Sequence, residues 1–364
     1  MQRRARTVDW RSGAPPSGEL ASVVEALSAG ELVALPTETV YGIAARADHA
    51  GAVERLARIK GRDPRQPLTW HVGDSAALER LPRVSPMARR LAEKYWPGPL
   101  TLVLPGVARG VETVGASGWT GVRRPAHAAS EALLRAAPFA IVATSANLHG
   151  REPLRDVASI LEVFGDELAF AIDGDAPRLG EASVVLRLGP GEFRLLREGI
   201  LDAAALRRVA GLEIAFVCTG NTCRSPMAAG FARKLLAERL AIAVGEIGRF
   251  GFGVRSMGVY AHSGAPASEH AVDTMREQGI DLTGHRAACA VPEELAAMSR
   301  VYALTRSHLE AIRMLLPPGK DRHCALLDPG GRDVADPVGG TRADYEFAAR
   351  QIRLAIEVRL DEWA

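Results

Sequence analysis

The chain has 364 residues, of which 47% are hydrophobic and 24% charged, and its 45 Lys and Arg against 43 Asp and Glu leave a net charge of +2. This length predicts two globular domains, and the apolar content excludes an intrinsically disordered chain. The near-neutral balance excludes a protein that coats nucleic acid or an anionic membrane through bulk charge, so any such contact must be local.

Apolar runs and cysteines narrow the class further. No stretch reaches the ~18 consecutive apolar residues of a membrane span, and the N-terminus lacks the apolar segment of a secretory signal. We therefore expect a cytoplasmic protein without membrane contact. Cys218, Cys223, Cys289 and Cys324 form no C-x-x-C pair, so neither a disulfide framework nor a zinc site is predicted, and no metal ligands are assigned.

In the first half, short apolar runs alternate with amphipathic helical patterns, which predicts an α/β fold. The first 18 residues are expected to form a flexible arm. A new strand follows Gly211, so we predict domains at 19–211 and 212–364. The predicted strands are 32–35, 68–72, 101–104, 139–143, 183–186 and 193–196, and the predicted helices are 128–137, 153–163 and a short segment that ends near Val209.

In the second half, strand, loop and helix follow one another in regular succession. Strand 214–217 leads into helix 225–240, strand 301–304 leads into helix 307–315, and a final helix covers about 341–362. This succession is typical of a parallel sheet with helices on its faces.

Polar residues gather in short stretches of the first half, near the ends of predicted strands. The chain has no P-loop and no dinucleotide-binding glycine motif. Instead, two cations two positions apart, Lys60 and Arg62, could straddle a triphosphate, and hydroxyls at a strand end could hold its oxygens or a small amino acid. Each stretch alone also fits a turn or a helix cap. The stretches are 36–42, 60–62, 70–71, 121–125 and 144–147.

The order and spacing of these stretches resemble those of the threonylcarbamoyl-AMP synthase family, which catalyses the first step of tRNA threonylcarbamoyladenosine synthesis. The resemblance implies a twisted α/β sheet with a large positively charged cavity. It also implies a reaction that joins L-threonine, bicarbonate and ATP into threonylcarbamoyl-AMP and pyrophosphate, usually with Mg²⁺. It covers about residues 18–211 and includes LPTETVYG (35–42), IKGR (59–62), YWPGPLT (95–101), ATSAN (143–147), GEAS (180–183) and LLREG (195–199).

The synthase resemblance also implies roles for individual residues and partners. Arg123 would take the carboxylate of threonine, and Thr37, His71 and Ser183 would contact the rest of that amino acid. Downstream tRNA threonylcarbamoyl-transfer proteins are expected partners, and a contact with tRNA or double-stranded RNA is compatible with the family. The nucleotide and its phosphates would contact Lys60, Arg62, Ser145, Asn147 and Arg197.

The clearest chemical signal is the stretch VCTGNTCRSPM at residues 217–227. An apolar strand ends at Cys218, a short glycine-containing loop follows, and Ser225 with the proline after it is a typical helix start. Backbone N–H groups of such a loop, backed by the positive end of a helix, form an anion site, and the same field stabilises a thiolate. Arg224 closes the loop with a planar fork that suits two phosphoryl oxygens.

This loop resembles the active site of the low-molecular-weight protein phosphatases, and the resemblance extends over about residues 214–363. A second hallmark of that family, an Asp-Pro pair far downstream, matches Asp336 and Pro337 just before the final predicted helix. Taken alone, Asp336 would be read as a turn residue. The family match predicts a catalytic role, a phosphoprotein substrate and no cofactor for this domain.

The phosphatase resemblance assigns a part to each loop residue. Cys218 would be the nucleophile that forms a phosphocysteine, and Asp336 would protonate the leaving group and then activate water. Arg224 would bind the phosphate, Asn221 would brace the loop, and Ser225 would donate a hydrogen bond to the thiolate.

Two features of the loop leave alternatives open. Cys223 would form a reversible disulfide with Cys218, as the resemblance implies, or it is a small residue packed behind the loop. Thr222 is similar to the threonine of the protein-arginine-phosphatase branch, which replaces a bulkier aliphatic residue of tyrosine phosphatases and favours phosphoarginine. Val338 departs from that branch, where an aromatic residue is usual, so phosphotyrosine stays a second candidate.

Three interpretations of the whole chain compete. In the first, both halves are active and the chain is a fusion of a synthase and a phosphatase. In the second, the first half is an inactive nucleotide- or RNA-binding module that delivers the phosphatase. In the third, it transfers carbamoyl groups in hydrogenase maturation, which the absence of zinc-finger cysteine spacing disfavours. The first is preferred because all four threonine-contacting residue types are present.

Overall fold

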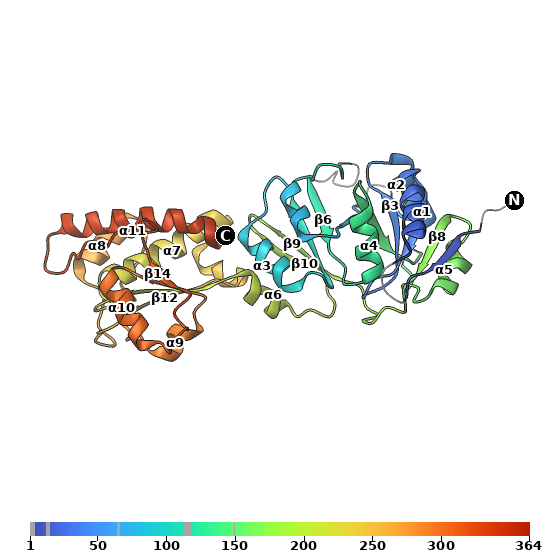
Figure 1. Ribbon diagram of the computed structural model, residues 1–364. Coiled ribbons are helices and arrows are strands. Elements are labelled where there is room, and N and C mark those ends of the chain that lie inside the picture. The colour runs from blue at the N-terminus through green and yellow to red at the C-terminus, as the bar shows by residue number, and fades with distance from the viewer. Residues whose placement is uncertain (1–3, 12–14, 64–65, 113–117, 149) are drawn as a thin grey trace. The chain divides into compact units, whose positions relative to one another are not determined.

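The computed structural model describes residues 4–11, 15–63, 66–112, 118–148 and 150–364 (Figure 1). It divides into two compact units, Met1–Leu206 and Arg207–Ala364. Helix α6 (Ala203–Ala210) contains the division, and the predicted boundary at Gly211 directly follows this helix.

The first unit is built on a single twisted sheet of mixed direction. Among the described residues the strand order is β1-β8-β2-β3-β7-β4-β6-β5-β9-β10. The strands are β1 (Arg6–Asp9), β2 (Leu32–Leu35), β3 (Gly42–Arg46), β4 (Thr69–His71), β5 (Leu100–Pro105), β6 (Trp119–Arg123), β7 (Ile141–Ser145), β8 (Leu168–Asp173), β9 (Val184–Gly189) and β10 (Glu192–Arg197). The helices are α1 (Ser17–Ser28), α2 (Ala50–Ile59), α3 (Pro86–Tyr95), α4 (Ala128–Ala136) and α5 (Val157–Phe164), with a 3₁₀ segment at Ser75–Arg80.

The N-terminal segment differs from the flexible arm that the sequence predicts. Residues of β1 pair in parallel with β8, Val8 opposite Ile172, and Val8 and Trp10 are buried. Helix α1 then starts at Ser17. Burial of two large apolar side chains holds this segment against the sheet edge, although its sequence is basic and rich in proline. Residues 1–3 and 12–14 of the predicted arm lie outside the described residues.

Apolar side chains attach helices to both faces of the first sheet. Leu27 of α1 and Leu133 of α4 join one buried cluster with Val33 and Leu35 of β2. On strand β5, Leu102 is fully buried on the side of α3, whereas its neighbour Thr101 points to the opposite face. Because successive strand residues point to opposite faces, β5 packs an apolar side chain on one face of the sheet and lines a cavity with a polar one on the other.

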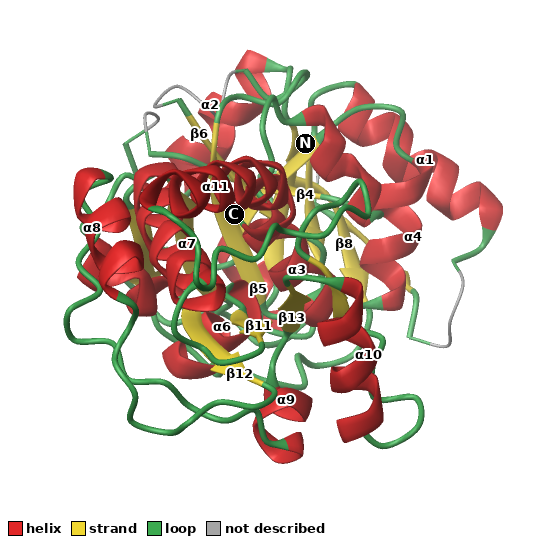
Figure 2. Ribbon diagram, turned by 90° about the vertical axis from the view of Figure 1, so that its left-hand side faces the viewer, coloured by secondary structure: helices red, strands yellow, loops and turns green. Residues whose placement is uncertain are grey.

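The second unit contains a four-stranded sheet in the order β12-β11-β13-β14, and every pairing in it is parallel, which confirms the predicted parallel sheet. In Figure 1, helices α7, α8 and α11 lie on one side of this sheet and α9 and α10 on the other, and Figure 2 gives the same separation. The strands are β11 (Glu213–Cys218), β12 (Gly253–Gly258), β13 (Arg300–Ala303) and β14 (Cys324–Leu326). The helices are α7 (Arg224–Leu240), α8 (Glu269–Glu277), α9 (Pro292–Ala297), α10 (Arg306–Leu315) and α11 (Arg342–Trp363), with a 3₁₀ segment at Val244–Phe250.

Strand β11 lies between two neighbours and is buried on both faces, which explains why its sequence is one unbroken apolar run. Its carboxyl end delivers Cys218 to the edge of the sheet where open α/β sheets bind ligands. The end of the chain packs on the same core, because Trp363 of α11 contacts the rings of Phe216 and Tyr302. Across the described ranges, no helix is both long and apolar enough to cross a membrane.

Candidate active sites

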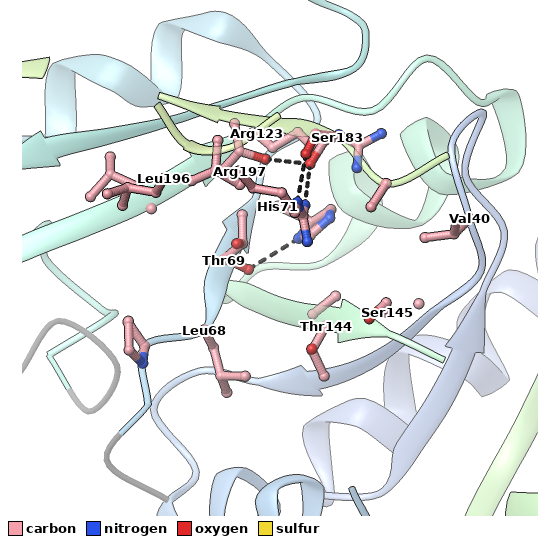
Figure 3. A pocket seen from close by; sticks show the side chains of 18 of the residues that line it. Val40, Leu68, Thr69, His71, Arg123, Thr144, Ser145, Ser183, Leu196 and Arg197 are labelled. Atoms are coloured by element: carbon pink, nitrogen blue, oxygen red, sulfur yellow. Dashed lines mark hydrogen bonds between the residues drawn. The ribbon is translucent and has the colours of Figure 1, made fainter. Parts of the chain in front are cut away.

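A cavity of about 360 Å³ lies over the central strands of the first unit (Figure 3). Its walls come from alternate residues of neighbouring strands, whose side chains share one face of the sheet. The parallel register of β4 and β6 sets His71 beside Arg123 and Thr69 beside Gly121. Seven of the nine residues that the sequence assigns to the synthase site line this cavity: Thr37, Arg62, His71, Arg123, Ser145, Ser183 and Arg197.

Arg123 is buried and already has a counter-charge. Its Nη2 donates to Glu38 Oε1 at 2.7 Å and to Thr39 Oγ1 at 2.8 Å, and its Nε donates to Gly98 O at 3.2 Å. The second oxygen of Glu38 accepts from the backbone N–H of Ala126 at 2.9 Å. A buried carboxylate with both oxygens bonded is fixed in place, so it holds the guanidinium in one orientation.

Ser183 and Arg197 form a second polar group on the cavity wall. Arg197 donates from Nη2 to Ser183 Oγ at 2.9 Å and from Nε to Ser183 O at 2.8 Å. Ser183 Oγ also lies 2.8 Å from Thr101 Oγ1. Burial lowers the pKa of Arg197, and the charge of Arg123 adds to this. Among the described residues, four arginines line this one cavity, Arg62, Arg123, Arg187 and Arg197, which suits a ligand with more than one negative charge.

Thr37 lies in a turn that its own side chain stabilises. Its Oγ1 donates to Val40 O at 2.6 Å and accepts from the backbone N–H of Thr39 and Val40, each at 3.2 Å. The turn is buried and presents Thr37 and Val40 to the cavity. This local bonding is the Ser/Thr turn chemistry expected for such a residue, and it fixes one rim of the cavity.

Lys60 and Asn147 do not line the cavity but lie behind Ser145. Lys60 Nζ donates to Asn147 Oδ1 at 2.9 Å and also to Ser145 O. Ser145 Oγ donates to the same Asn147 oxygen at 2.5 Å. Burial, and to a smaller extent the charge of Arg62, lowers the pKa of Lys60 to about 8. A pKa of about 8 leaves the lysine mostly protonated near pH 7, and neutral oxygens hold its ammonium group.

His71 is neutral near pH 7. Burial, with a smaller contribution from the charge of Arg123, lowers the pKa of His71 to about 4. Its Nδ1 lies 3.0 Å from Thr69 O, and because a carbonyl oxygen only accepts, this nitrogen carries the ring proton. The other ring nitrogen, Nε2, is left as an acceptor.

In the second unit, the nucleophile candidate lies at the floor of a short loop. Cys218 is 3% exposed, and its Sγ is 2.9 Å from Ser225 Oγ at the start of α7. The serine hydroxyl also lies 3.2 Å from Met257 O and accepts from Asn221 Nδ2 at 2.8 Å. Its single proton is thus shared between the carbonyl and the sulfur, and a thiolate would attract it.

The loop backbone depends on Asn221. This residue has φ of 55°, in the left-handed region that Asn tolerates better than most residues. Its Oδ1 accepts from the N–H of Ala288 at 2.8 Å, and its carbonyl oxygen lies 2.7 Å from His285 Nε2. A Cβ on Gly258 would come within 2.5 Å of Thr219 O, so glycine is required where β12 passes the loop.

Five consecutive backbone donors of the loop are free for an anion. Within the described part of the chain, the N–H groups of residues 219–223 donate to no protein acceptor. They come directly before the N-terminus of α7, a helix of 17 residues. Unpaired N–H groups and the positive helix end together favour a bound phosphate.

Arg224 and Asp336 lie together although they are far apart in the sequence. Arg224 Nη2 donates to Asp336 Oδ2 at 2.6 Å, and Nη1 donates to Val334 O at 3.3 Å. The Arg224 side chain is 5% exposed, whereas that of Asp336 is 51% exposed. The arginine fork is therefore fixed inside the site, and the carboxylate sits at its mouth.

The remaining cysteines have different surroundings. Cys223 is buried and reduced, with its Sγ 3.3 Å from both Ser268 Oγ and Tyr345 OH. Cys324 is buried, and burial raises its thiol pKa to about 11, whereas Cys289 is exposed. The packed environment of Cys223 matches one of its two predicted states, and the disulfide with Cys218 stays a prediction.

Some supporting residues were not assigned from the sequence. Glu38, Thr39 and Thr101 lie inside the motif stretches at 35–42 and 95–101, so the motifs contained a signal for them. His285, Ser268 and Tyr345 lie 45 to 122 positions from their loop partners. No local pattern indicates such contacts, because they arise only when α8, α11 and the segment that follows α8 pack around the loop.

Comparison with known proteins relates each unit to a family. The family described as "Telomere recombination", of Sua5, YciO and YrdC proteins, matches residues 25–199. The threonylcarbamoyl-AMP synthase of Halorhodospira halophila is 39% identical over 158 residues, which is 42% of this chain and 80% of that protein. That of Pyrococcus abyssi is 37% identical over 190 residues, 50% of this chain, but the chain spans only 54% of its length.

The second unit matches another family. The low-molecular-weight phosphotyrosine protein phosphatase family covers residues 213–364. The solved YwlE arginine phosphatase of Geobacillus stearothermophilus aligns with 34% identity and a TM-score of 0.36, over 42% of this chain and 91% of that one. The two family matches do not overlap, and the gap between them falls at α6 and Gly211.

The neutral state of buried His71 predicts a loss of stability in acid. Its pKa in the folded protein, about 4, lies below the unfolded value of 6.5, so the folded state binds fewer protons. The stability that depends on the neutral ring is fully present above pH 6.5. As the pH falls toward 4, the free energy of unfolding decreases by on the order of 3 kcal/mol. Urea unfolding at pH 7 and at pH 4.5 measures this loss.

His71→Gln is expected to lose less stability than the wild type between those two pH values, because glutamine does not titrate. His262→Gln is the matched control, since His262 is exposed in the other unit. An equal pH-dependent loss in the wild type and in His71→Gln would contradict the prediction.

Proposed function

The chain belongs to the threonylcarbamoyl-AMP synthase family through residues 25–199 and carries a low-molecular-weight phosphatase domain in residues 213–364, and on this basis we propose that it is a bifunctional enzyme. The first unit would form threonylcarbamoyl-AMP and pyrophosphate from L-threonine, bicarbonate and ATP. The second would hydrolyse a protein phosphoester or phosphoramidate through a phosphocysteine.

One observation carries the synthase proposal. The cavity brings a guanidinium, hydroxyls and a neutral imidazole together at the scale of an amino acid, beside a second guanidinium. Arg123 keeps Glu38 on one side, so its Nη1, which has no acceptor among the described residues, is the group that would take the carboxylate of threonine. Thr37, His71 and Ser183 would surround the amino group and side chain.

The chemistry we assign to this cavity is positioning and charge neutralisation. Threonine and bicarbonate would give a carbamate and water, and a carbamate oxygen would then attack the α-phosphorus of ATP while the bond to pyrophosphate breaks. The amine must be neutral to react, so its proton would leave to solvent, and the unprotonated Nε2 of His71 would accept a hydrogen bond from the amine. Arg62 and Arg197 would offset the charge on the phosphates, Ser145 would bond their oxygens, and Lys60 with Asn147 would act from behind Ser145.

Mg²⁺ is proposed as part of the bound nucleotide. Among the described residues, no group of three or more His, Cys, Asp and Glu side chains is placed to hold an ion. Mg²⁺ commonly keeps several waters and binds through substrate phosphates, so ATP itself would carry it, where it would neutralise phosphate charge. The residues assigned above bind and orient the substrates.

The phosphatase proposal rests on the pairing of Cys218 with Ser225 and of Arg224 with Asp336. The Cys218 thiolate would attack phosphorus, and the loop N–H groups and Arg224 would hold the three phosphoryl oxygens. Asp336, at the mouth, would give a proton to the leaving group. The same carboxylate would then remove a proton from the water that hydrolyses the phosphocysteine.

Phosphoarginine is the substrate that we propose, and phosphotyrosine is the alternative. Thr222 is partly exposed, and its backbone is fixed by the bond from Ser268 N to Thr222 O at 2.9 Å. A small polar side chain there leaves room for a guanidinium or the attacking water and offers little apolar surface to a phenol ring. Val338 is 67% exposed and would form the outer wall of the site.

The proposal places the protein in the cytoplasm, where tRNA threonylcarbamoyl-transfer proteins would use its first product. The competing interpretation, an inactive RNA-binding first unit, predicts no adenylate product but a direct complex with tRNA or double-stranded RNA. The synthase assay distinguishes the two.

For the synthase, we expect wild-type protein incubated with ATP, threonine and bicarbonate to release pyrophosphate and threonylcarbamoyl-AMP. Lys60→Ala should lower the rate by about 100-fold or more, because it removes the cation directly behind Ser145 that would stabilise charge on the transferring phosphate. Arg123→Ala should raise the KM for threonine strongly, although it strands Glu38 and its folding must be checked. Product is measured by chromatography and a pyrophosphate assay.

The control is Lys94→Ala, because Lys94 is an exposed lysine on α3, and its rate should equal that of the wild type. No product from the wild type, or full activity in Lys60→Ala, would overturn the synthase proposal. Binding of tRNA by a protein without synthase activity would support the competing interpretation.

For the phosphatase, Cys218→Ser should abolish hydrolysis of p-nitrophenyl phosphate, while Cys289→Ser, a change at the exposed cysteine, should leave it intact. Asp336→Asn should slow the release of poor leaving groups by about 100-fold or more, within the range of general acid catalysis, and good leaving groups less. Steady-state rates on aryl phosphates of graded leaving-group pKa measure this difference. A uniform loss across the series would contradict an acid role for Asp336.

For the substrate, we expect kcat/KM on a phosphoarginine peptide to exceed that on the matched phosphotyrosine peptide by about tenfold or more. One or two well-placed polar contacts to the preferred substrate give a difference of this size. Thr222→Ile should reverse this order, whereas the isosteric Thr222→Val separates the loss of the hydroxyl from the gain of bulk. The result that would refute the phosphoarginine assignment is a wild-type preference for phosphotyrosine.

A further inference from the structure

His308 is a buried imidazole that the proposed phosphatase chemistry does not use. It lies in the first turn of α10 and is 5% exposed. Both ring nitrogens meet hydroxyls, Nε2 at 2.8 Å from Thr219 Oγ1 and Nδ1 at 2.8 Å from Thr305 Oγ1. Thr219 directly follows Cys218 and is the first residue of the anion loop.

The ring is uncharged, which matters beside a cationic site. Burial, then the charge of Arg224, lowers the pKa of His308 to about 4, and Asp336 and Asp333 oppose this only in part. A neutral imidazole donates from one nitrogen and accepts at the other. It therefore satisfies one hydroxyl in each direction without adding a second positive charge next to Arg224.

Thr219 is held at two points. Its carbonyl oxygen accepts from the N–H of Tyr260 at 3.0 Å, and its hydroxyl bonds to His308. Its own N–H is one of the loop donors that have no protein acceptor among the described residues. Fixing the carbonyl and the side chain sets the direction of the peptide groups on either side, and with it the direction of those donors.

The same helix end also holds the loop that carries Asp336. The N–H of Arg306 donates to Asp333 Oδ1 at 2.9 Å, and its side chain donates to Gly331 O. The N–H of Val334 donates to Leu304 O at 2.9 Å. The start of α10 therefore contacts both sides of the site, the segment before the acid and, through His308, the residue after the nucleophile.

From this geometry we propose that His308 is a positioning residue of the phosphatase site, which aligns the anion loop with the Asp336 segment through its hydrogen bond to Thr219. The proposal rests on the phosphatase function proposed above and adds a specific residue to it. His308 touches no substrate atom. Its removal is expected to weaken the hold on phosphate and to lower the rate, because the loop donors lose their common direction.

Two substitutions at His308 separate its two hydrogen bonds. In His308→Asn the side-chain amide takes the place of Nδ1, so the bond to Thr305 is kept and the bond to Thr219 is lost. In His308→Gln the longer side chain places its amide at the position of Nε2, so the bond to Thr219 is kept and the bond to Thr305 is lost. Thr219→Val removes the partner hydroxyl with little change in volume, and Glu310→Gln, at an exposed position of α10, is the matched control.

Each full-length variant is tested for binding of inorganic phosphate by calorimetry and for kcat and KM on p-nitrophenyl phosphate, with the melting temperature as a check of folding. His308→Asn and Thr219→Val should each weaken phosphate binding and lower kcat/KM by about tenfold, the effect of losing one buried hydrogen bond. The double variant should lose no more than either single variant, since both changes remove the same bond. His308→Gln and Glu310→Gln should stay within about threefold of the wild type, because neither removes that bond.

The proposal is overturned if His308→Asn and Thr219→Val lower only the melting temperature and leave phosphate affinity unchanged, or if their losses multiply in the double variant. If His308→Asn does not fold, phosphate affinity and kcat/KM of Thr219→Val and of His308→Gln still test the proposal, because only Thr219→Val should lower them. A wild type that binds phosphate but hydrolyses neither p-nitrophenyl phosphate nor a phosphoarginine peptide refutes the proposed phosphatase function, while the binding series still tests His308. A wild type that does not bind phosphate overturns both.

Discussion

A guanidinium that is buried before any ligand arrives needs a counter-charge inside the protein, because an unpaired buried cation costs several kcal/mol. Both candidate sites meet this requirement with one carboxylate. Glu38 bonds Arg123 at 2.7 Å in the first unit, and Asp336 bonds Arg224 at 2.6 Å in the second. Around each pair the neighbouring loops are fixed by backbone N–H groups and hydroxyls, so the position of the cation sets the geometry of the rest of the site.

The two pairs differ in what they allow. Glu38 is 4% exposed and has both oxygens bonded, so it stays with Arg123 as part of the scaffold. Asp336 is 51% exposed, so water can solvate it when an incoming phosphate takes its place on the buried arginine. The first pair suits an arginine that orients a ligand with its remaining N–H groups. The second suits an arginine that exchanges one anion for another.

Neutral histidines complete both sites for a related reason. His71 and His308 each lie close to an arginine, and burial keeps each ring uncharged. A protonated ring would repel the neighbouring guanidinium, whereas a neutral ring bonds to a carbonyl or a hydroxyl without changing the local charge. Hydroxyl groups add further neutral contacts: Ser183 bonds both Arg197 and Thr101, and Ser225 lies between Cys218 and the carbonyl oxygen of Met257.

The sequence by itself determined the elements and stretches whose signal is local. The apolar run at 214–217, the loop and the helix start at Ser225 predicted β11 and α7 closely, and strand β2 matches its prediction. Strand β6 was not assigned, because Thr120 and Gly121 interrupt its apolar pattern and its partners β4 and β5 supply its stability. Strand β1 was placed in an arm because its partner β8 lies far along the chain.

Only the tertiary structure decided which of these residues meet. It put Lys60 behind Ser145 rather than on the cavity wall, paired Arg123 with Glu38, and brought His308 to Thr219 across 89 positions. The residue types and their order are written in the chain, because strand and helix periodicity and loop motifs depend on neighbours. Distances between side chains depend on strand order and register, which arise from burial of the whole sheet and leave no local mark in the sequence.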